Sequence, residues 1–512
     1  MASATRRVYV ISDIHLGGRY PESGDPEDRG FRISTQVSRL TDFVGALADK
    51  SAGDPEIELV INGDFIDFLA EAGDAAAGWL PFTADPGAAT RKLEAIVARD
   101  RPLFDALGRL LANGHRLTIL LGNHDIELAL PPVRRRLCEL MGVGARHQFQ
   151  FIYDGEAYVI GDTLIEHGNR YDMFNVVDHD ALRRYRSLLS RQQEVPSQYL
   201  FDAPTGSKIV ASVMNPIKRL YPFIDLLKPE TGAAVPILLA LEPGTRKLLA
   251  RMALLVNQAR KHRLAGDALP GFGGDIHADG AMDEPFGQDI GSSVDDFTAA
   301  PASGASDDAE AALGEVITLA MGEEADSFLA DVESAGSSAD PGPDIGEDIS
   351  TAEFVDRSMG LAKLLLSKND ADVERRLPCL LKAVRALHND KSFDRTTESA
   401  SEYLNAARDL AGGGFRCIVF GHTHLAKRVD LGDGRVYINS GTWADVMRFP
   451  TELVAGAQGD ALGRLRSFVD DLRIGKLRRW IGFEGTYARL GFDASERLVS
   501  AELCDFESAE QV

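Results

Sequence analysis

Five short polar motifs each follow an apolar run of the sequence: Asp13-Ile14-His15, Gly63-Asp64-Phe65-Ile66-Asp67, Gly122-Asn123-His124-Asp125, His167-Gly168 and Gly421-His422-Thr423-His424. Their carboxylates, amide and imidazoles suit divalent transition metals better than Mg²⁺ or Ca²⁺, which prefer oxygen ligands. One such motif alone is usually ordinary loop polarity, but five in order would be a costly cluster of polar groups without a ligand. The sequence therefore predicts a metal site.

The elements before these motifs alternate between short and long apolar patterns. Residues 8–12, 59–62 and 117–121 read as buried strands, while residues 35–48 and 90–113 have the three-to-four spacing of helices that cover a sheet. Residues 149–166 add two strand-like segments around the turn Gly161-Asp162. In an open α/β sheet the residues just beyond the carboxyl ends of the strands converge on one rim, so we expect the motifs to meet there.

The middle of the chain has a different character. Segments 182–191, 209–227 and 246–263 are helical in pattern and rich in Lys and Arg, and residues 265–350 are too poor in apolar side chains to offset their ordering entropy. We therefore expect a core from residues 1–175 and 411–512, interrupted by a basic helical insertion (176–263), an acidic, disordered segment (264–350) and a second helical part (351–410). A hairpin from residues 487–492 and 497–504 would complete the core.

The net charge of −23 is a local property, because residues 264–356 contain 23 Asp and Glu and no Lys or Arg. The acidic and basic side chains balance elsewhere, so the charge says little about what the folded part binds. The four cysteines lie far apart and form no CxxC pair, which argues against a disulfide framework or a thiolate zinc site. Without a secretory signal or a membrane-spanning run, the sequence predicts a cytoplasmic protein.

The five motifs, read as DxH, GDxxD, GNH, a lone His and GHxH, resemble the signature of the calcineurin-like metallophosphoesterase superfamily. The resemblance covers the start of the chain and the region from Gly421 onward, and not the middle. It implies an α/β fold, a four-layer α/β/β/α sandwich, with two bound metals. The resemblance assigns Asp13, His15 and His424 to the first metal, Asn123, His167 and His422 to the second, and Asp64 to both as a bridge.

By the same resemblance His124 faces the substrate instead of binding a metal, and Asp67 orients its imidazole. Asp125 is the alternative orienting residue, or a cap of the following helix; we favour Asp67. The segment 437–443, YINSGTW, either holds a ligand loop through Asn439 or Ser440 or is an ordinary strand-ending turn.

The chemistry implied is hydrolysis of a phosphate ester. Two divalent cations, Mn²⁺ as the first choice and Fe or Zn²⁺ as alternatives, would generate a bridging hydroxide that attacks phosphorus. His124 would stabilise the developing charge or protonate the leaving group. The sequence leaves open a phosphomonoester, a phosphodiester or a pyrophosphate bond.

The basic helices of the insertion allow two interpretations. These helices either pack with a solvated outer face or form a cap, whose side chains Arg183, Arg184, Arg186, Lys218 and Arg219 attract an anionic phosphate-ester substrate. The UDP-diacylglucosamine pyrophosphatase branch is similar in carrying a helical insertion here, but it has Arg at the position of His124 and an insertion of another length.

Other functions remain as alternatives. A nuclease is not favoured, because few aromatic residues interleave with the basic ones and the acidic segment would repel nucleic acid. A non-catalytic scaffold for protein partners conflicts with the intact ligand set. Residues 473–480, RIGKLRRW, are either a peripheral membrane contact or a solvated helix end. The oligomeric state is not predictable from the sequence.

Overall fold

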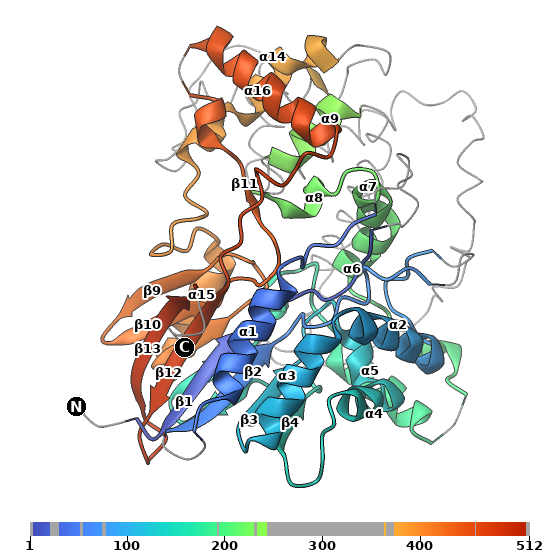
Figure 1. The fold of residues 1–512 in the computed structure, drawn as a ribbon, viewed down its shortest axis with the longest axis vertical. Helices are drawn as coiled ribbons and strands as arrows, with labels where there is room; N and C mark the ends of the chain where they lie inside the picture. Colours follow the sequence, from blue (N-terminus) through green and yellow to red (C-terminus); the bar gives the residue numbers. More distant parts are fainter. Residues whose placement is uncertain are drawn as a thin grey trace, which may run out of the picture. The chain divides into compact units, whose positions relative to one another are not determined.

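The computed structural model of the chain describes residues 4–20, 30–51, 55–73, 78–191, 194–229, 233–242, 363–364, 373–455 and 457–507. The described residues have the mixed α/β architecture that the sequence predicts, with sheets covered by helices (Figure 1). The predicted helix over residues 246–263 and the predicted disordered segment 264–350 lie outside the described residues.

The first sheet has six strands in the order β13-β12-β1-β2-β3-β4. Strands β1 to β4 run parallel, and the hairpin β12–β13 adds antiparallel to β1, as expected from the end of the sequence. The strands are β1 (Arg6–Ile11), β2 (Glu56–Asn62), β3 (Arg116–Leu120), β4 (Gln148–Ile152), β12 (Thr486–Phe492) and β13 (Leu498–Asp505).

Four helices belong with this sheet: α1 (Val37–Ala48), α2 (Pro86–Arg99), α3 (Arg101–Ala112) and α4 (Pro131–Leu140). Helices α1 and α3 lie side by side in Figure 1 and contact each other. The pattern over residues 90–113 predicts one helix, but the structure has a break at Asp100, between α2 and α3. Pro102 explains the break, since proline cannot donate the backbone hydrogen bond that would continue the helix.

The second sheet has five strands in the order β5-β6-β8-β10-β9. Its strands are β5 (Tyr158–Ile160), β6 (Thr163–Ile165), β8 (Cys417–Phe420), β9 (Lys427–Gly432) and β10 (Arg435–Asn439). The turn Gly161-Asp162 joins β5 and β6, as predicted, although residues 149–166 contribute three strands instead of two.

The side chains of β1 show how one strand serves two packing surfaces. Val8 and Val10 join a buried cluster that contains residues of both sheets, whereas Tyr9 and Ile11 join the cluster that packs against α1 and α3. This is the alternation of a strand that is buried on both faces. On the second sheet, Ile418 and its neighbours pack against helix α15 (Ser401–Gly412).

The remaining described elements are mostly helical. They are α5 (His179–Leu189), α6 (Thr205–Ile209), a π-helical turn (Val210–Met214), α7 (Asn215–Lys218), α8 (Phe223–Leu226), α9 (Val235–Leu241), α14 (Val373–Val384), α16 (Gln458–Arg473) and the pair β7 (Leu227–Lys228) and β11 (Met447–Arg448). Helices α9, α14 and α16 contact one another. The sequence predicts that the insertion ends at residue 410. In the structure α16, which follows this residue, packs with helices of the predicted insertion, whereas α15, which begins before it, packs with a sheet.

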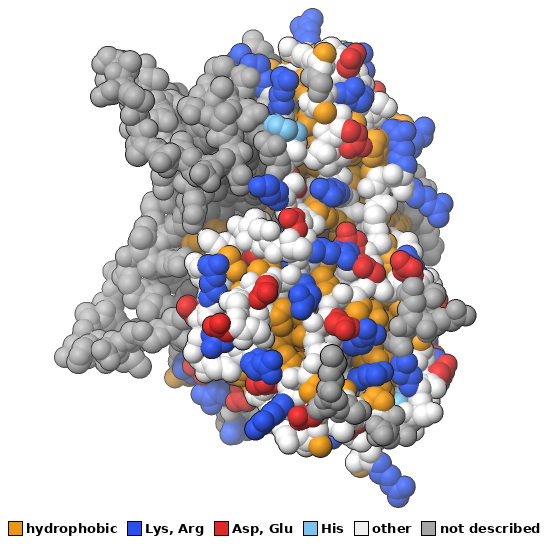
Figure 2. Space-filling model, turned by 90° about the vertical axis from the view of Figure 1, so that its left-hand side faces the viewer, with side chains coloured by type: hydrophobic (Ala, Val, Ile, Leu, Met, Phe, Trp, Pro, Cys, Tyr) orange, Lys and Arg blue, Asp and Glu red, His pale blue; other side chains and the backbone are white. Residues whose placement is uncertain are grey.

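No helix in the described ranges is long and apolar enough to cross a membrane. The segment that follows α16 folds back on it, because Trp480 Nε1 donates to Asp471 Oδ2 at 3.1 Å and its ring packs on Phe468. On the face shown in Figure 2, basic and acidic side chains of the described residues are interspersed.

Candidate metal centre

The predicted motifs all stand at the ends of strands. Asp13, Asp64, His167 and His422 lie two residues beyond β1, β2, β6 and β8, and Asn123 lies three residues beyond β3. Parallel pairing of β1, β2 and β3 puts the first loops at one rim. Parallel pairing of β6 with β8 does the same for the two histidines. The side chains are buried or nearly so.

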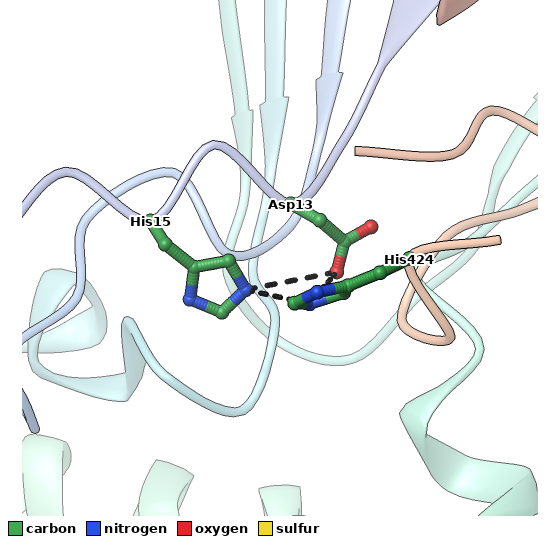
Figure 3. Close-up of side chains that lie close together, drawn as sticks. All are labelled: Asp13, His15 and His424. Atoms are coloured by element: carbon green, nitrogen blue, oxygen red, sulfur yellow. Dashed lines mark hydrogen bonds and ion pairs between the residues drawn. The ribbon is translucent and has the colours of Figure 1, made fainter. Parts of the chain in front are cut away.

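The first group of side chains is Asp13, His15 and His424 (Figure 3). The two Nε2 atoms of the histidines lie 2.9 Å apart, and Asp13 Oδ1 lies 3.4 Å from His424 Nε2 and 3.9 Å from His15 Nε2. One carboxylate oxygen and two imidazole nitrogens thus face a common point, which is an arrangement suited to a divalent cation.

The second group is Asp64, His167 and His422. Asp64 Oδ2 lies 3.3 Å from His167 Nε2 and 3.6 Å from His15 Nε2. A single carboxylate oxygen therefore reaches a histidine of each group, which is the position that a bridging ligand would need.

Three ligand-type atoms of the centre are buried without a hydrogen-bond partner among the described residues: Asp13 Oδ1, Asn123 Oδ1 and His167 Nε2. Buried polar atoms are almost always hydrogen bonded, so three unsatisfied acceptors at one place call for a ligand. The residues present thus fit the metals that the resemblance implies. The free amide oxygen of Asn123 adds a further candidate ligand atom to the Asp and His side chains of the two groups.

Three of the histidine rings are held at one nitrogen. His15 Nδ1 lies 3.3 Å from Asp67 Oδ2, His167 Nδ1 donates to the carbonyl of Asn62 at 2.8 Å, and His422 Nε2 lies 3.1 Å from Asp172 Oδ2. Such a partner fixes the tautomer of a histidine and leaves the lone pair of the other nitrogen for a metal.

The backbone of the centre is unusual as well. Asp13, His15, Asp64, His422 and His424 all have positive φ, between 50° and 69°. This left-handed conformation costs about 1–2 kcal/mol for a residue with a Cβ. Strained residues of this kind cluster at functional sites, where the surrounding structure holds them.

The glycines of the motifs make room for ligand side chains. A Cβ on Gly122 would lie 2.1 Å from Asp64 Oδ1, and a Cβ on Gly421 would lie 2.7 Å from Asp13 Oδ2. A larger residue at either position would displace a carboxylate of the centre.

His124 forms a third such group with His15 and Asp64, and its Nδ1 lies 3.2 Å from Asp67 Oδ1. Asp67 thus contacts both His124 and His15. Burial lowers the pKa of His124, but the carboxylates of Asp67 and Asp64 outweigh it and raise this pKa to about 9. Burial raises the pKa of Asp67, yet the two histidines hold it well below its usual range.

Asp125 has a different role from the alternatives that the sequence offered. Its carboxylate accepts from the backbone N–H of Gly122 at 2.7 Å and of Phe65 at 2.8 Å, and it makes no cap bond to the following 3₁₀ turn (Ile126–Ala129). It joins two of the motif loops.

The segment 437–443 holds two ligand loops. Asn439 Nδ2 donates to the carbonyl of Gly421 at 2.7 Å, the hydroxyls of Ser440 and Ser12 lie 2.7 Å apart, and Thr442 donates to the carbonyl of Asp13. Both residues singled out in the sequence, Asn439 and Ser440, make such contacts.

The basic residues of the predicted cap differ in what they contact. Arg183 lies 3.7 Å from Asp180, Arg184 stacks over Tyr199, and Arg186 stacks over Tyr153. Lys218 is buried in an ion pair with Asp225, and its charge contributes to lowering the pKa of His124. Lys228, which sequence reasoning missed, acts in the same direction on His424.

Sequence reasoning also missed Asp172 and Asn175, which touch proposed ligands. Neither belongs to a recognisable motif, and only the short distance along the chain from His167 pointed to them.

Residues 6–226 match the model of the family described as calcineurin-like phosphoesterase. The match includes the first four motifs and ends before the Gly421–His424 motif, which the fold adds to the same centre. No curated protein matches the chain.

Proposed function

We propose that the chain, whose residues 6–226 match the model of the calcineurin-like phosphoesterase family, is a metal-dependent hydrolase that cleaves a phosphate ester at a dinuclear centre. The observation that carries this proposal is the set of three buried ligand atoms without partners, next to two imidazole nitrogens only 2.9 Å apart. We also interpret the three buried clusters as the interfaces of a four-layer α/β/β/α sandwich.

In this proposal Asp13, His15 and His424 hold one cation, Asn123, His167 and His422 hold the other, and Asp64 contacts both. The position of Asp64 Oδ2 within 3.6 Å of His15 and 3.3 Å of His167 supports the bridge. Mn²⁺ is the first candidate, and Fe or Zn²⁺ would fit the same nitrogen and oxygen ligands. When bound, the cations would lower the pKa of a water molecule and neutralise phosphate oxygens.

His124 and Asp67 would act on the substrate side. Because Asp67 Oδ1 occupies the Nδ1 side of His124, the Nε2 side is left for the substrate. An imidazole held in this way can hydrogen bond a phosphate oxygen or give a proton to the leaving alkoxide, as general acids do. Asp67 would then be a positioning residue, which keeps the ring of His124 in one orientation.

We propose an anionic substrate, because the bound cations would neutralise phosphate oxygens. The choice between monoester, diester and pyrophosphate is left to experiment. The face shown in Figure 2 does not favour a long nucleic acid, since acidic side chains lie among the basic ones there. A non-catalytic scaffold would have no use for His124 or for the strained ligand backbone.

The test is hydrolysis of p-nitrophenyl phosphate and of bis-p-nitrophenyl phosphate with Mn²⁺, for wild type, Asp64→Ala and His124→Ala. Asp180→Ala, which removes an exposed carboxylate that pairs only with Arg183 among the described residues, is the matched control. We expect metal-dependent turnover in wild type and control and its loss in both other variants. Equal turnover in Asp64→Ala, or no metal bound to wild type, would contradict the proposal.

A further inference from the structure

We propose that Asp172 and Asn175 are positioning residues of the second cation site, so that this site is tied to α6 of the helical insertion while the first is not. The inference rests on the proposed metal centre. It assigns a role to two residues that lie outside all five motifs and that contact proposed ligands directly.

The carboxylate of Asp172 is held in place from two sides. Its Oδ2 accepts from Asn175 Nδ2 at 2.6 Å, and its Oδ1 accepts from the backbone N–H of Phe174 at 2.9 Å. The same Oδ2 lies 3.1 Å from His422 Nε2. A carboxylate anchored in this way can fix the orientation of the His422 ring.

The contact decides which nitrogen of His422 is available. When Nε2 carries the proton and donates it to Asp172, the lone pair of the ring is on Nδ1. His422 lies in the group with Asp64 and His167, so that lone pair is the one left for a cation. Carboxylate–histidine–metal triads of this type both orient the ring and raise its basicity.

Asn175 acts on a second ligand. Its Oδ1 accepts from Asn123 Nδ2 at 3.3 Å, while its own Nδ2 donates to Asp172. With its amide nitrogen engaged, Asn123 presents its oxygen in the other direction, and that oxygen is one of the three buried atoms without a partner. One network therefore holds two ligands of the second cation, His422 and Asn123.

The network touches the insertion at α6. The backbone N–H of Gly206, in α6, donates to the carbonyl of Phe174 at 2.7 Å. A Cβ on Gly206 would lie 2.1 Å from Asn175 Oδ1, so the helix backbone packs directly on the amide of Asn175.

The first cation site is anchored elsewhere. His15 is held by Asp67, and Thr442 holds the carbonyl of Asp13, both outside the insertion. The two sites are joined through Asp64 and through the backbone N–H of His422, which donates to Asp13 Oδ2. Loss of Asp172 should thus weaken one site and leave the other intact.

The experiment is calorimetric titration of metal-free protein with Mn²⁺, with the bound metal counted after dialysis, for wild type, Asp172→Ala, Asp172→Asn and Asn175→Ala. Asp178→Ala is the control, because Asp178 caps α5 through the N–H of Ala181 and contacts no residue of the centre within the described part of the chain. Outer ligand partners are typically worth about 10- to 100-fold in metal affinity. We expect Asp172→Ala to bind one Mn²⁺ as wild type does and the second about 10- to 100-fold more weakly.

Asp172→Asn keeps the shape and one acceptor oxygen, so we expect an intermediate loss and a normal melting temperature. Two sites of wild-type affinity in Asp172→Ala would overturn the inference, as would an equal weakening of both sites. Wild-type protein that binds two Mn²⁺ but hydrolyses no ester would contradict the proposed function and leave the inference standing. Wild-type protein that binds no Mn²⁺ would overturn both.

Discussion

The same sheet carries two buried polar clusters, one at each end of its parallel strands. At the amino ends, Glu58 accepts from Arg6, Thr118 and Tyr158, with distances of 2.7–3.2 Å for Arg6 Nε, Thr118 Oγ1 and Tyr158 OH. At the carboxyl ends, Asp13 and Asp64 face histidines, and ligand atoms remain unsatisfied. Burial is similar in the two clusters, so burial does not distinguish them.

The difference lies in what each cluster still needs. No side-chain atom of the Glu58 cluster is among the buried atoms without a partner in the described chain, and none of its residues has positive φ. The metal centre has both unsatisfied atoms and five strained residues. A polar cluster that satisfies itself stabilises the fold, whereas one that does not is prepared for a ligand.

The largest expected effect is on catalysis. His124→Ala should lower kcat/KM about 10²- to 10⁴-fold while two cations remain bound, because His124 is proposed to act on the substrate and not on the metals. The measurement combines steady-state kinetics with metal analysis of the same sample. Loss of a cation in this variant would instead make His124 a ligand, in line with its place beside His15 and Asp64.

Removal of the Glu58 carboxylate, at the amino ends of the parallel strands, should lower the stability of the fold instead of affecting catalysis. Glu58→Ala leaves the charge of Arg6 without its buried partner, and breaking a buried pair destabilises a protein by about 3–5 kcal/mol. Urea unfolding should show this loss, with unchanged Mn²⁺ binding in the folded protein. Glu496→Ala, which removes the exposed partner of Arg6, should change the free energy of unfolding by less than about 1 kcal/mol. Equal losses in the two variants would contradict the structural role of Glu58.

Cations should stabilise the fold only by binding at the metal centre, three of whose ligand atoms lack hydrogen-bond partners among the described residues. A ligand at 100 times its dissociation constant adds about 2.7 kcal/mol to the free energy of unfolding. We expect Mn²⁺ to raise the melting temperature of wild type and Glu496→Ala, and chelation to reverse the rise. In Asp64→Ala, Mn²⁺ should change the melting temperature little, since Asp64 contacts a histidine of each group. A rise as large as in wild type would mean that the stabilising cation binds elsewhere.

The smallest effect concerns the space around Asp64. Gly122→Ala forces a Cβ against Asp64 Oδ1, and overpacking of this kind costs about 1–3 kcal/mol. Mn²⁺ affinity should fall as well. Gly463→Ala, in α16 where nothing lies near the added atom, should stabilise the protein by about 0.5–1 kcal/mol. If Gly122→Ala changed neither the free energy of unfolding nor the Mn²⁺ affinity, the loop would move freely. That result would contradict the rigid centre inferred from the geometry.

Local patterns in the sequence predict the strands that carry the ligands, because a buried apolar run and the polar motif after it are adjacent in the chain. The buried apolar run of β1 and the strand ends before Asp64 and Asn123 are of this kind. The break before α3 was missed because the apolar spacing continues through Pro102.

Contacts between distant segments could not be predicted in the same way. The pairing of β7 with β11 and the packing of α16 on α9 and α14 join segments far apart in the sequence. An amphipathic pattern shows that a helix has an apolar face and not which surface it covers. For the same reason Asp172 and Asn175 were visible only once the loop after His167 was placed next to His422 and Asn123.

The most direct test of the central claim is the number of divalent cations bound to each chain. Purified protein is stripped by chelation, dialysed against Mn²⁺ and analysed by elemental mass spectrometry, beside Asp64→Ala treated identically. We expect two Mn²⁺ per wild-type chain, with ester hydrolysis restored on reloading, and fewer Mn²⁺ in Asp64→Ala. A wild-type chain that takes up none, or an Asp64→Ala chain that takes up as many as wild type, would contradict the claim.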